Sequence, residues 1–375
     1  MKPKYQIFLF SFILLNCSCI KQFIPSVNEI NELLVVQGLI TNQRETYKIL
    51  LSRSLPLGEN SSANPVTGYK LQISDDQGNS FSLKESVPGT YITDSTKFIG
   101  VIGRFYTLHI SVTENSYFSY ESAPMEMKPV PPIDSIYYEK VVVKEKHEDW
   151  FGVDACQIYL DTHDQENSCR YFRWDFRETW VHRLLFPVPY MTCWVSDRSK
   201  SIDIKSNAEL EKVKIIRHPV TYISNISDRL KRKYSILVNQ YSLNEDEYTY
   251  WEKVKTYTDR VGGFYDIIPA SIPGNISAKF NSNVKVLGYF SVSAKSSKRI
   301  FIQDNFAGII DRYTNCISDT LVGDYDPPEL NITKWTLIDN SIPTPRVRVL
   351  TSIYGCYDCR VRGTSIKPDF WTDDK

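Results

Sequence analysis

The sequence predicts a mainly β protein of two domains, the second of which carries one prominent α-helix. Most apolar segments are short, rich in β-branched and aromatic residues, and separated by turn residues. Helical spacing with matching end signals occurs only at residues 243–260. A proline-dense stretch at 127–133 separates the strands into two groups. We therefore expect a β-sandwich over residues 33–126, a linker, and a larger β-rich domain over residues 134–375.

The first residues have the pattern of an export signal. Lys2 and Lys4 precede a short apolar run from Ile7 to Leu15, and the cysteines Cys17 and Cys19 follow it. The run is too short to span a bilayer comfortably, and it is typical of a leader peptide that ends at a lipidated cysteine. This pattern predicts an exported bacterial lipoprotein.

The position of the cleavage is argued from the residue that precedes each cysteine. Cleavage before Cys19 leaves the small Ser18 at the end of the leader, whereas cleavage before Cys17 leaves an asparagine there, which is less usual. We therefore expect a signal peptide over residues 1–18, a lipid on Cys19 with Cys17 as the alternative, and a tether over residues 19–32. An uncleaved amphipathic anchor and a plain signal peptide remain open.

Charge and hydropathy limit the classes of partner that the protein can have. The chain has 44 basic and 44 acidic residues, and removing the leader with Lys2 and Lys4 lowers the basic count to 42. This balance argues against nucleic acid and against a polybasic membrane surface as partners. No other apolar run approaches the roughly 20 residues of a transmembrane helix, so we expect the lipid to be the only anchor.

Strand-type runs of the first domain follow one another closely. Asp75 to Asn79 stands between two of them, and Gly78 and Asn79 tolerate the positive φ of a tight hairpin connection. The expected strands cover residues 33–40, 47–52, 69–74, 80–85 and 106–113.

The second domain repeats this pattern. The run at 170–180 alternates Phe172, Trp174 and Phe176 with charged residues, which predicts one buried and one solvated face. We favour core packing for these aromatics over a ligand platform. The expected strands cover residues 135–144, 153–160, 170–180, 284–293 and 299–303.

The sequence contains signals for both the start and the end of this helix. Ser242 and Glu245 match a capping box, Trp251 and Val254 recur at helical spacing, and a Gly-Gly pair follows Val261. These signals predict a helix from about residue 243 to residue 260.

Six cysteines remain once the leader is removed with Cys17 and Cys19 carries the lipid, and an even number suits an oxidising compartment. Zinc is disfavoured because no second pair of ligands lies near the Cys356/Cys359 pair, and a redox role would need that pair to open a helix after a strand. Structural disulfides are the preferred interpretation, with 15 pairings open. The candidates are Cys156, Cys169, Cys193, Cys316, Cys356 and Cys359.

No catalytic constellation stands out, and we expect neither a metal nor a cofactor. The five histidines lack the spacing of a metal site on one helical face, and no serine sits in a GxSxG turn. His147, His163 and the acidic loop at 324–329 are better explained as solvated loops than as metal sites. A carboxylate pair of a glycosidase is neither supported nor excluded, because the fold sets the separation of the two acids.

Several motifs are distributed along the chain. They are FIP at 23–25, LVVQGLITN at 34–42, LSRS at 51–54, VPPIDSIYYE at 130–139, YWEKVK at 250–255, GGF at 262–264, PGNI at 273–276, LGYFSVSA at 287–294 and CYDCRVRGTSIKPDFW at 356–371. Together these motifs resemble the Bacteroidota lipoprotein family catalogued as domain of unknown function 4249, and the resemblance covers nearly the whole mature chain.

The resemblance implies an outer-membrane lipoprotein that is an accessory to a TonB-dependent β-barrel receptor. It also implies that the first domain is similar to immunoglobulin-like or carboxypeptidase-regulatory sandwiches. The membrane face stays open between periplasm and cell surface, because Ile20 to Gln22 lack the acidic residues that often follow the lipidated cysteine of surface lipoproteins. Ser95, Ser135 and Thr320 lie in triplets that resemble the short O-glycosylation pattern of this phylum.

The function we expect is therefore a non-enzymatic binding or accessory subunit, held at the outer membrane by its lipid. The alternative is a glycan-binding or hydrolytic surface lipoprotein, in which aromatic residues and carboxylates line a cleft.

Overall fold

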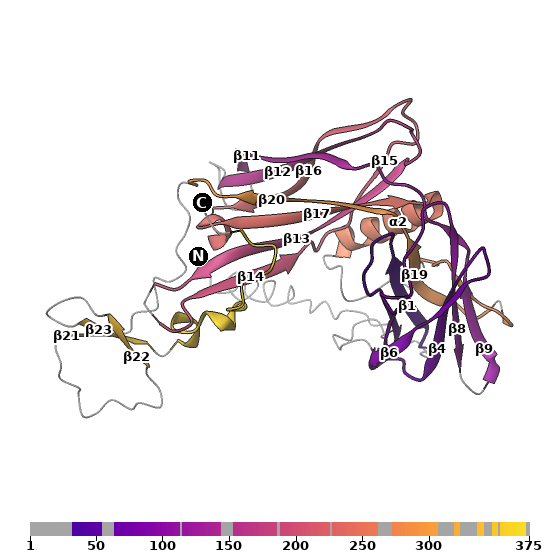
Figure 1. Ribbon diagram of the computed structural model, residues 1–375, viewed down its shortest axis with the longest axis horizontal. Coiled ribbons are helices and arrows are strands. Elements are labelled where there is room, and N and C mark those ends of the chain that lie inside the picture. The colour runs from indigo at the N-terminus through magenta and orange to yellow at the C-terminus, as the bar shows by residue number, and fades with distance from the viewer. Residues whose placement is uncertain are drawn as a thin grey trace, which may run out of the picture.

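The computed structural model is mainly β, as predicted, with one long helix. The residues that it describes are 32–54, 64–112, 115–143, 153–185, 188–225, 227–261, 272–281, 283–306, 319–322, 336–340, 347–351 and 353–372. The predicted signal peptide, both candidate lipid cysteines and the acidic loop at 324–329 lie outside these ranges. Figure 1 shows a β-sandwich at one end and a second layered β unit beside it.

The sandwich consists of two six-stranded sheets. The first has the order β19 (Val286–Val292), β1 (Leu34–Ile40), β2 (Lys48–Arg53), β7 (Thr90–Ile92) and β6 (Lys84–Val87), with β3 (Asn64–Pro65) also paired with β2. The second has the order β18 (Ile276–Ala278), β9 (Asn115–Ser122), β8 (Phe105–Val112), β4 (Tyr69–Asp75) and β5 (Ser80–Ser82), with β10 (Met125–Glu126) also paired with β8.

The predicted hairpin at residues 75–79 joins β4 to β5. Gly78 has φ +83°, and the Asp75 carboxylate accepts hydrogen bonds from the backbone of Gln77 (3.0 Å) and Asn79 (2.9 Å). The hairpin was predicted from the tolerance of Gly78 and Asn79 for positive φ, and Gly78 is the residue that adopts it.

The chain returns to the sandwich after the helix, which the predicted division into residues 33–126 and 134–375 did not include. β19 pairs in parallel with β1 over its full length, and β18 pairs with β9. Every residue of β19 is buried, as expected for a parallel strand covered on both faces. Gly288 has φ +87°, and a Cβ atom there would lie 2.0 Å from the carbonyl oxygen of Val36, so the contact with β1 requires glycine.

The second unit has two stacked sheets around a separate apolar core. Phe172 and Trp174 are almost fully buried in that core, which confirms the core interpretation of these aromatics. One sheet has the order β11 (Ile133–Val143), β12 (Val153–Asp164), β16 (Val213–Ser224), and the other has the order β14 (Thr192–Arg198), β13 (Tyr171–Arg183), β17 (Tyr234–Leu243), β20 (Lys295–Ile302), with β15 (Asp203–Ser206) paired with β13.

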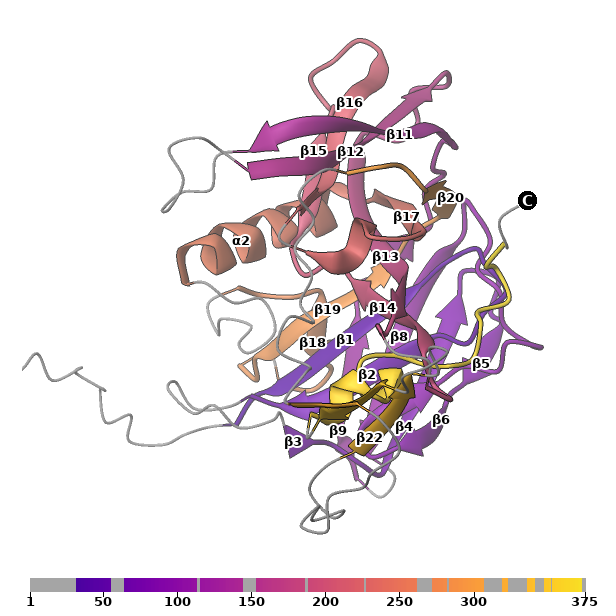
Figure 2. The ribbon, with the colours of Figure 1, turned by 90° about the vertical axis from the view of Figure 1, so that its left-hand side faces the viewer.

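The long helix, α2 (Glu245–Val261), follows β17 directly and lies between the two units (Figure 2). Its Tyr250 and Val254 are buried in the core of the sandwich. The predicted capping role of Ser242 is wrong: Ser242 is still in β17, and its hydroxyl donates to the carbonyl of Lys128 (2.6 Å). The first turn starts instead at Asn244, whose carbonyl accepts from the Tyr248 N–H (2.9 Å).

The proline-dense segment at 127–133 is held in place by hydrogen bonds. Gln240 on β17 donates to the carbonyl of Pro131 (2.8 Å), and Thr162 on β12 donates to that of Pro132 (3.0 Å). Prolines cannot donate from their backbone nitrogen, but their carbonyls remain acceptors. The segment is therefore a fixed connection between the units.

The remaining elements lie beyond β20, apart from one short 3-10 helix before β17. That helix is η1 (Asp228–Leu230), and the others are η2 (Tyr354–Cys356) and η3 (Cys359–Val361). A small sheet has the order β21 (Asp319–Val322), β23 (Val347–Thr351) and β22 (Thr336–Asn340). In the part of the chain that the structure covers, no helix has the length and apolar character needed to cross a membrane.

Candidate interaction face

The outer surface of the sheet β11-β12-β16 carries a connected set of polar and aromatic side chains. Alternation along each strand places residues such as Ile158, Leu160 and Ile215 in the core and their neighbours on the opposite side. Among the described elements, no other layer covers this sheet on its outer side (Figure 1). We call the set the tyrosine–arginine face and define it as Ser135, Tyr137, Glu139, Tyr159, Asp161 and Arg217.

Asp161 organises the tyrosine–arginine face. Its carboxylate accepts hydrogen bonds from the hydroxyl of Ser135 (3.1 Å), the hydroxyl of Tyr137 (3.2 Å) and the backbone N–H of Arg217 (2.7 Å). A single carboxylate therefore joins all three strands on their outer side. Hydrogen bonds to an ionised acceptor are roughly twice as strong as neutral ones.

Arg217 adopts a backbone conformation that is uncommon for a residue with a side chain. Its φ is +57°, and it lies where the pairing of β12 with β16 changes register. Such bulges re-aim side chains and recur next to functional sites. Here the bulge directs the guanidinium to both carboxylate oxygens of Glu139 and over the ring of Tyr159, 4.3 Å from its centroid.

The charge pair on this face is well matched. The hydrogen bonds from Arg217 lower the pKa of Glu139 below its ordinary value, so the carboxylate stays ionised near neutral pH. About half of the Arg217 side chain is exposed. The rings of Tyr137 and Tyr159 lie 5.7 Å apart and are tilted by 31°. The face therefore presents two aromatic rings and a guanidinium in fixed positions, and tyrosine and arginine are typical of binding surfaces.

The three serine and threonine residues in the glycosylation-like triplets have different surroundings. Ser135 is half-buried, and its hydroxyl is bonded to Asp161 within the tyrosine–arginine face. Ser95 is half-buried in a turn that the Asp94 carboxylate closes through Thr96. Thr320 is in β21, and its side chain lies outside the described part of the structure.

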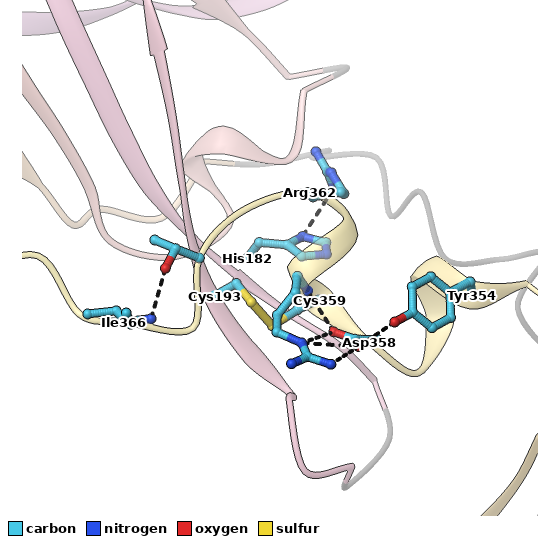
Figure 3. Close-up of a disulfide and its surroundings, with 9 residues drawn as sticks. His182, Cys193, Tyr354, Asp358, Cys359, Arg362 and Ile366 are labelled. Carbon is cyan, nitrogen blue, oxygen red and sulfur yellow. Dashed lines mark hydrogen bonds and ion pairs between the residues drawn. A yellow bond between two sulfur atoms is a disulfide. The ribbon is translucent and has the colours of Figure 1, made fainter. Parts of the chain in front are cut away.

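A disulfide attaches the carboxy-terminal segment to the second unit. Cys193 on β14 and Cys359 on η3 are bonded, with their Cα atoms 5.7 Å apart (Figure 3). Cys356 is also in a disulfide, and Cys316 lies outside the described residues. The Cys-x-x-Cys pair is therefore neither an internal bridge nor a reduced dithiol.

The prediction of a disulfide is wrong for two of the six candidate cysteines. Cys156 and Cys169 are free thiols, and both are buried. Each lies in the apolar core of the second unit, where a thiol packs as a small apolar group. Burial raises the pKa of both thiols to about 12, so they are protonated and poorly nucleophilic at neutral pH.

A buried ionic cluster reinforces the attachment of the carboxy-terminal segment. Arg362 donates two hydrogen bonds to Asp228, of 2.5 and 3.2 Å, and His182 Nδ1 lies 3.5 Å from the same carboxylate. Burial by itself would raise the pKa of Asp228, but the hydrogen bonds from His182 and Arg362 outweigh it and hold that pKa well below the ordinary value. The cluster is thus a charged clamp between η1, β13 and the carboxy-terminal segment.

The sequence-derived metal and catalytic candidates do not converge. His163 lies beside Asp134, with Nδ1 2.6 Å from the carboxylate, on an exposed edge. Within the described ranges, no three side chains among histidine, cysteine, aspartate and glutamate are grouped to hold a metal ion. His147 lies outside those ranges.

In the sequence, Asp161 was considered only in the polar cluster around His163, which was interpreted as a solvated loop but lies in β12, and Arg217 was not singled out. The three hydrogen-bond donors of Asp161 come from different strands. Pro219, two residues after Arg217, was the available signal, because proline inside a strand pattern marks an edge or a bulge.

Fold and face together define a mainly β protein with a preorganised surface on an outer sheet and a disulfide-attached carboxy-terminal segment. Residues 20–299 match the family model described as Domain of unknown function (DUF4249). The chain therefore belongs to this family. No curated protein matches the chain.

Proposed function

We propose that this chain is a Bacteroidota outer-membrane lipoprotein and acts as a non-enzymatic binding subunit of a TonB-dependent receptor system. Support for the anchor comes from the leader-like sequence that ends at Cys19. Support for a binding role comes from the tyrosine–arginine face, which is the single observation that carries the proposal. The described structure places this face on the outer side of a sheet, with Asp161 and Arg217 fixing its geometry.

The energetics of the tyrosine–arginine face favour a macromolecular partner. Side chains that are already ordered lose little conformational entropy on binding, so more of the interaction energy appears as affinity. Binding hot spots are enriched in tyrosine and arginine, and their truncation costs about 2 kcal/mol or more. The face therefore suits a protein surface that covers the sheet β11-β12-β16.

A detergent pull-down from native outer membranes tests the receptor proposal. We expect a large β-barrel to co-purify with the unaltered lipoprotein and to fall at least about tenfold when Tyr137 and Tyr159 are both replaced by alanine. Phe105→Ala is the matched control, because Phe105 is an exposed aromatic on the sandwich and its loss should leave the barrel bound. Recovery of the lipoprotein as a free monomer under mild detergent would contradict the proposal.

The lipid anchor has its own test. Cys19→Ala is expected to leave the protein unacylated and outside the membrane fraction, whereas Cys17→Ala should keep both the lipid and the membrane association. Fractionation and mass spectrometry of the amino terminus measure both properties. Membrane retention of Cys19→Ala would move the assignment to Cys17 or to another type of anchor.

Glycan binding is the second candidate, and the paired rings of Tyr137 and Tyr159 favour it specifically. Aromatic rings offer stacking surfaces to apolar faces of ligands, and the two half-buried rings have their centroids 5.7 Å apart. Signals on a polysaccharide array that disappear in the Tyr137→Ala/Tyr159→Ala variant, together with an empty pull-down, would select this function over the receptor role.

A further inference from the structure

A cleft of about 520 Å³ lies on the second unit, away from the tyrosine–arginine face. Four short segments meet there: the ends of β13 and β14, the turn between η1 and β17, the residues after β20, and the carboxy-terminal segment. Its volume falls in the range of small-molecule pockets, about 300–1,000 Å³.

The charge of this cleft is strongly one-sided. Among the described residues, its lining includes the cationic side chains Arg183, Lys231, Arg232 and Lys233, and one acid, Asp304. That acid is ion-paired with Lys140 at 3.1 Å, outside the cleft. Lys231 and Lys233 have further partners of their own, so the positive potential of the described lining rests on Arg183 and Arg232, and low-dielectric walls concentrate it. The overall charge balance of the chain concealed this local excess.

The walls of the cleft are built into the fold. Lys233 donates to the carbonyl of Thr372 (2.6 Å), and its ammonium lies 5.2 Å from the ring centroid of Phe301. Trp371 packs edge-on against Phe301, with centroids 5.5 Å apart. The disulfide of Cys359 and the clamp of Arg362 hold the segment that carries Trp371. The ligand would therefore meet an ordered wall.

The chemistry of the lining selects an oxyanion. Arginine offers planar pairs of donors that match phosphate and sulfate, and lysine adds compact positive charge. Val181 and Trp371 supply an apolar boundary to the same space. We propose that this cleft binds a small molecule through a phosphate or sulfate group, with its neutral part along Val181 and Trp371. This proposal is independent of the receptor role, because it uses none of the residues of the tyrosine–arginine face.

Titration calorimetry of the full-length protein in detergent tests the cleft, with glucose 6-phosphate as the anionic probe and glucose as its uncharged counterpart. We expect heat from the phosphate ester only, and an affinity that decreases as salt is added. Arg183→Ala/Arg232→Ala should weaken binding at least about tenfold, since hydrogen bonds between charged groups are stronger than neutral ones.

Lys212→Ala/Lys214→Ala removes the same charge and is the matched control. Neither lysine lines the cleft, and Lys214 lies opposite His163 in the pairing of β16 with β12. This variant should therefore bind the probe as the unaltered protein does. An equal loss of affinity in both double variants would indicate a general charge effect and would overturn the proposal that the cleft is the binding site.

The source of the phosphate is distinguished by vesicles. Phosphatidylglycerol vesicles that are bound better than phosphatidylcholine vesicles, with the difference lost in Arg183→Ala/Arg232→Ala, would identify a lipid headgroup. A response to glucose 6-phosphate alone would identify a free phosphorylated molecule. No response to either probe, or a response that the cleft variant retains, would overturn the proposal.

Discussion

Replacing Cys193 by serine is expected to lower the free energy of unfolding by about 2–5 kcal/mol. The bond joins residues 166 positions apart, and cross-links that close long loops restrict the unfolded chain most strongly. The variant should also loosen the segment around η3, because Cys359 would then be held only by its neighbours. Hydrogen exchange at residues 353–372 should accelerate more than exchange in the sandwich.

Denaturant unfolding with and without a reductant measures this effect. The reductant should destabilise the unaltered protein and leave Cys193→Ser less affected. Cys156→Ala is the matched control, because Cys156 is a buried free thiol; this variant should keep the full response to the reductant. If Cys193→Ser unfolded at the same denaturant concentration as the unaltered protein, the disulfide would have no stabilising role.

Replacing Asp228 by alanine should destabilise the fold by about 3–5 kcal/mol, the usual cost of breaking a buried ion pair. The change leaves the guanidinium of Arg362 and the ring of His182 without their shared acceptor in a site where Asp228 is only 6% exposed. Asp369→Ala is the control in the same segment, since Asp369 is exposed and its loss should change stability by less than about 0.5 kcal/mol.

The pH dependence of this cluster has a definite sign. The pKa of Asp228 is lower in the folded state than the ordinary value of about 3.9. Its contribution to stability is therefore complete above about pH 5 and decreases as the pH falls toward the folded-state pKa. Urea unfolding between pH 7 and pH 3 should show acid destabilisation that is weaker in Asp228→Ala. Parallel curves for the two proteins would exclude Asp228 as a source of acid sensitivity.

Local sequence patterns were sufficient for most strands. Alternation placed Phe172 and Trp174 in a core, and Gly78 and Asn79 predicted the hairpin. The helix was found at nearly its observed position, yet its cap was misassigned. Ser242 matched the capping pattern but already belongs to β17, because its hydroxyl bonds to Lys128 and Ala294 across the structure.

Pairings between residues far apart in the chain could not be predicted from the sequence. The apolar runs of β1 and β19 were recognised separately, but nothing local indicates that they are parallel neighbours. The same holds for the disulfide of Cys193 with Cys359, one of 15 pairings that the sequence left open. Cys156 and Cys169 were misjudged because an even number of cysteines does not reveal which of them face an apolar core.

Only part of the tyrosine–arginine face could be predicted from the sequence. The strands at 135–144 and 153–160 were predicted, but their outward side chains were not identified as a surface. Arg217 reaches them through a bulge with positive φ, and such a conformation depends on the pairing of β12 with β16. The basic cleft was invisible for the same reason, since its four cations come from two separate parts of the chain.

The parallel pairing of β1 with β19 constrains how the protein is made. The partner of Leu34 is Val286, about 250 positions later, so one edge of β1 stays open until the chain is available for folding as far as β19. An open apolar edge is a template for aggregation. The amino-terminal sandwich therefore cannot be completed before the rest of the chain, its completion is among the last events of folding, and the open edge needs protection until then.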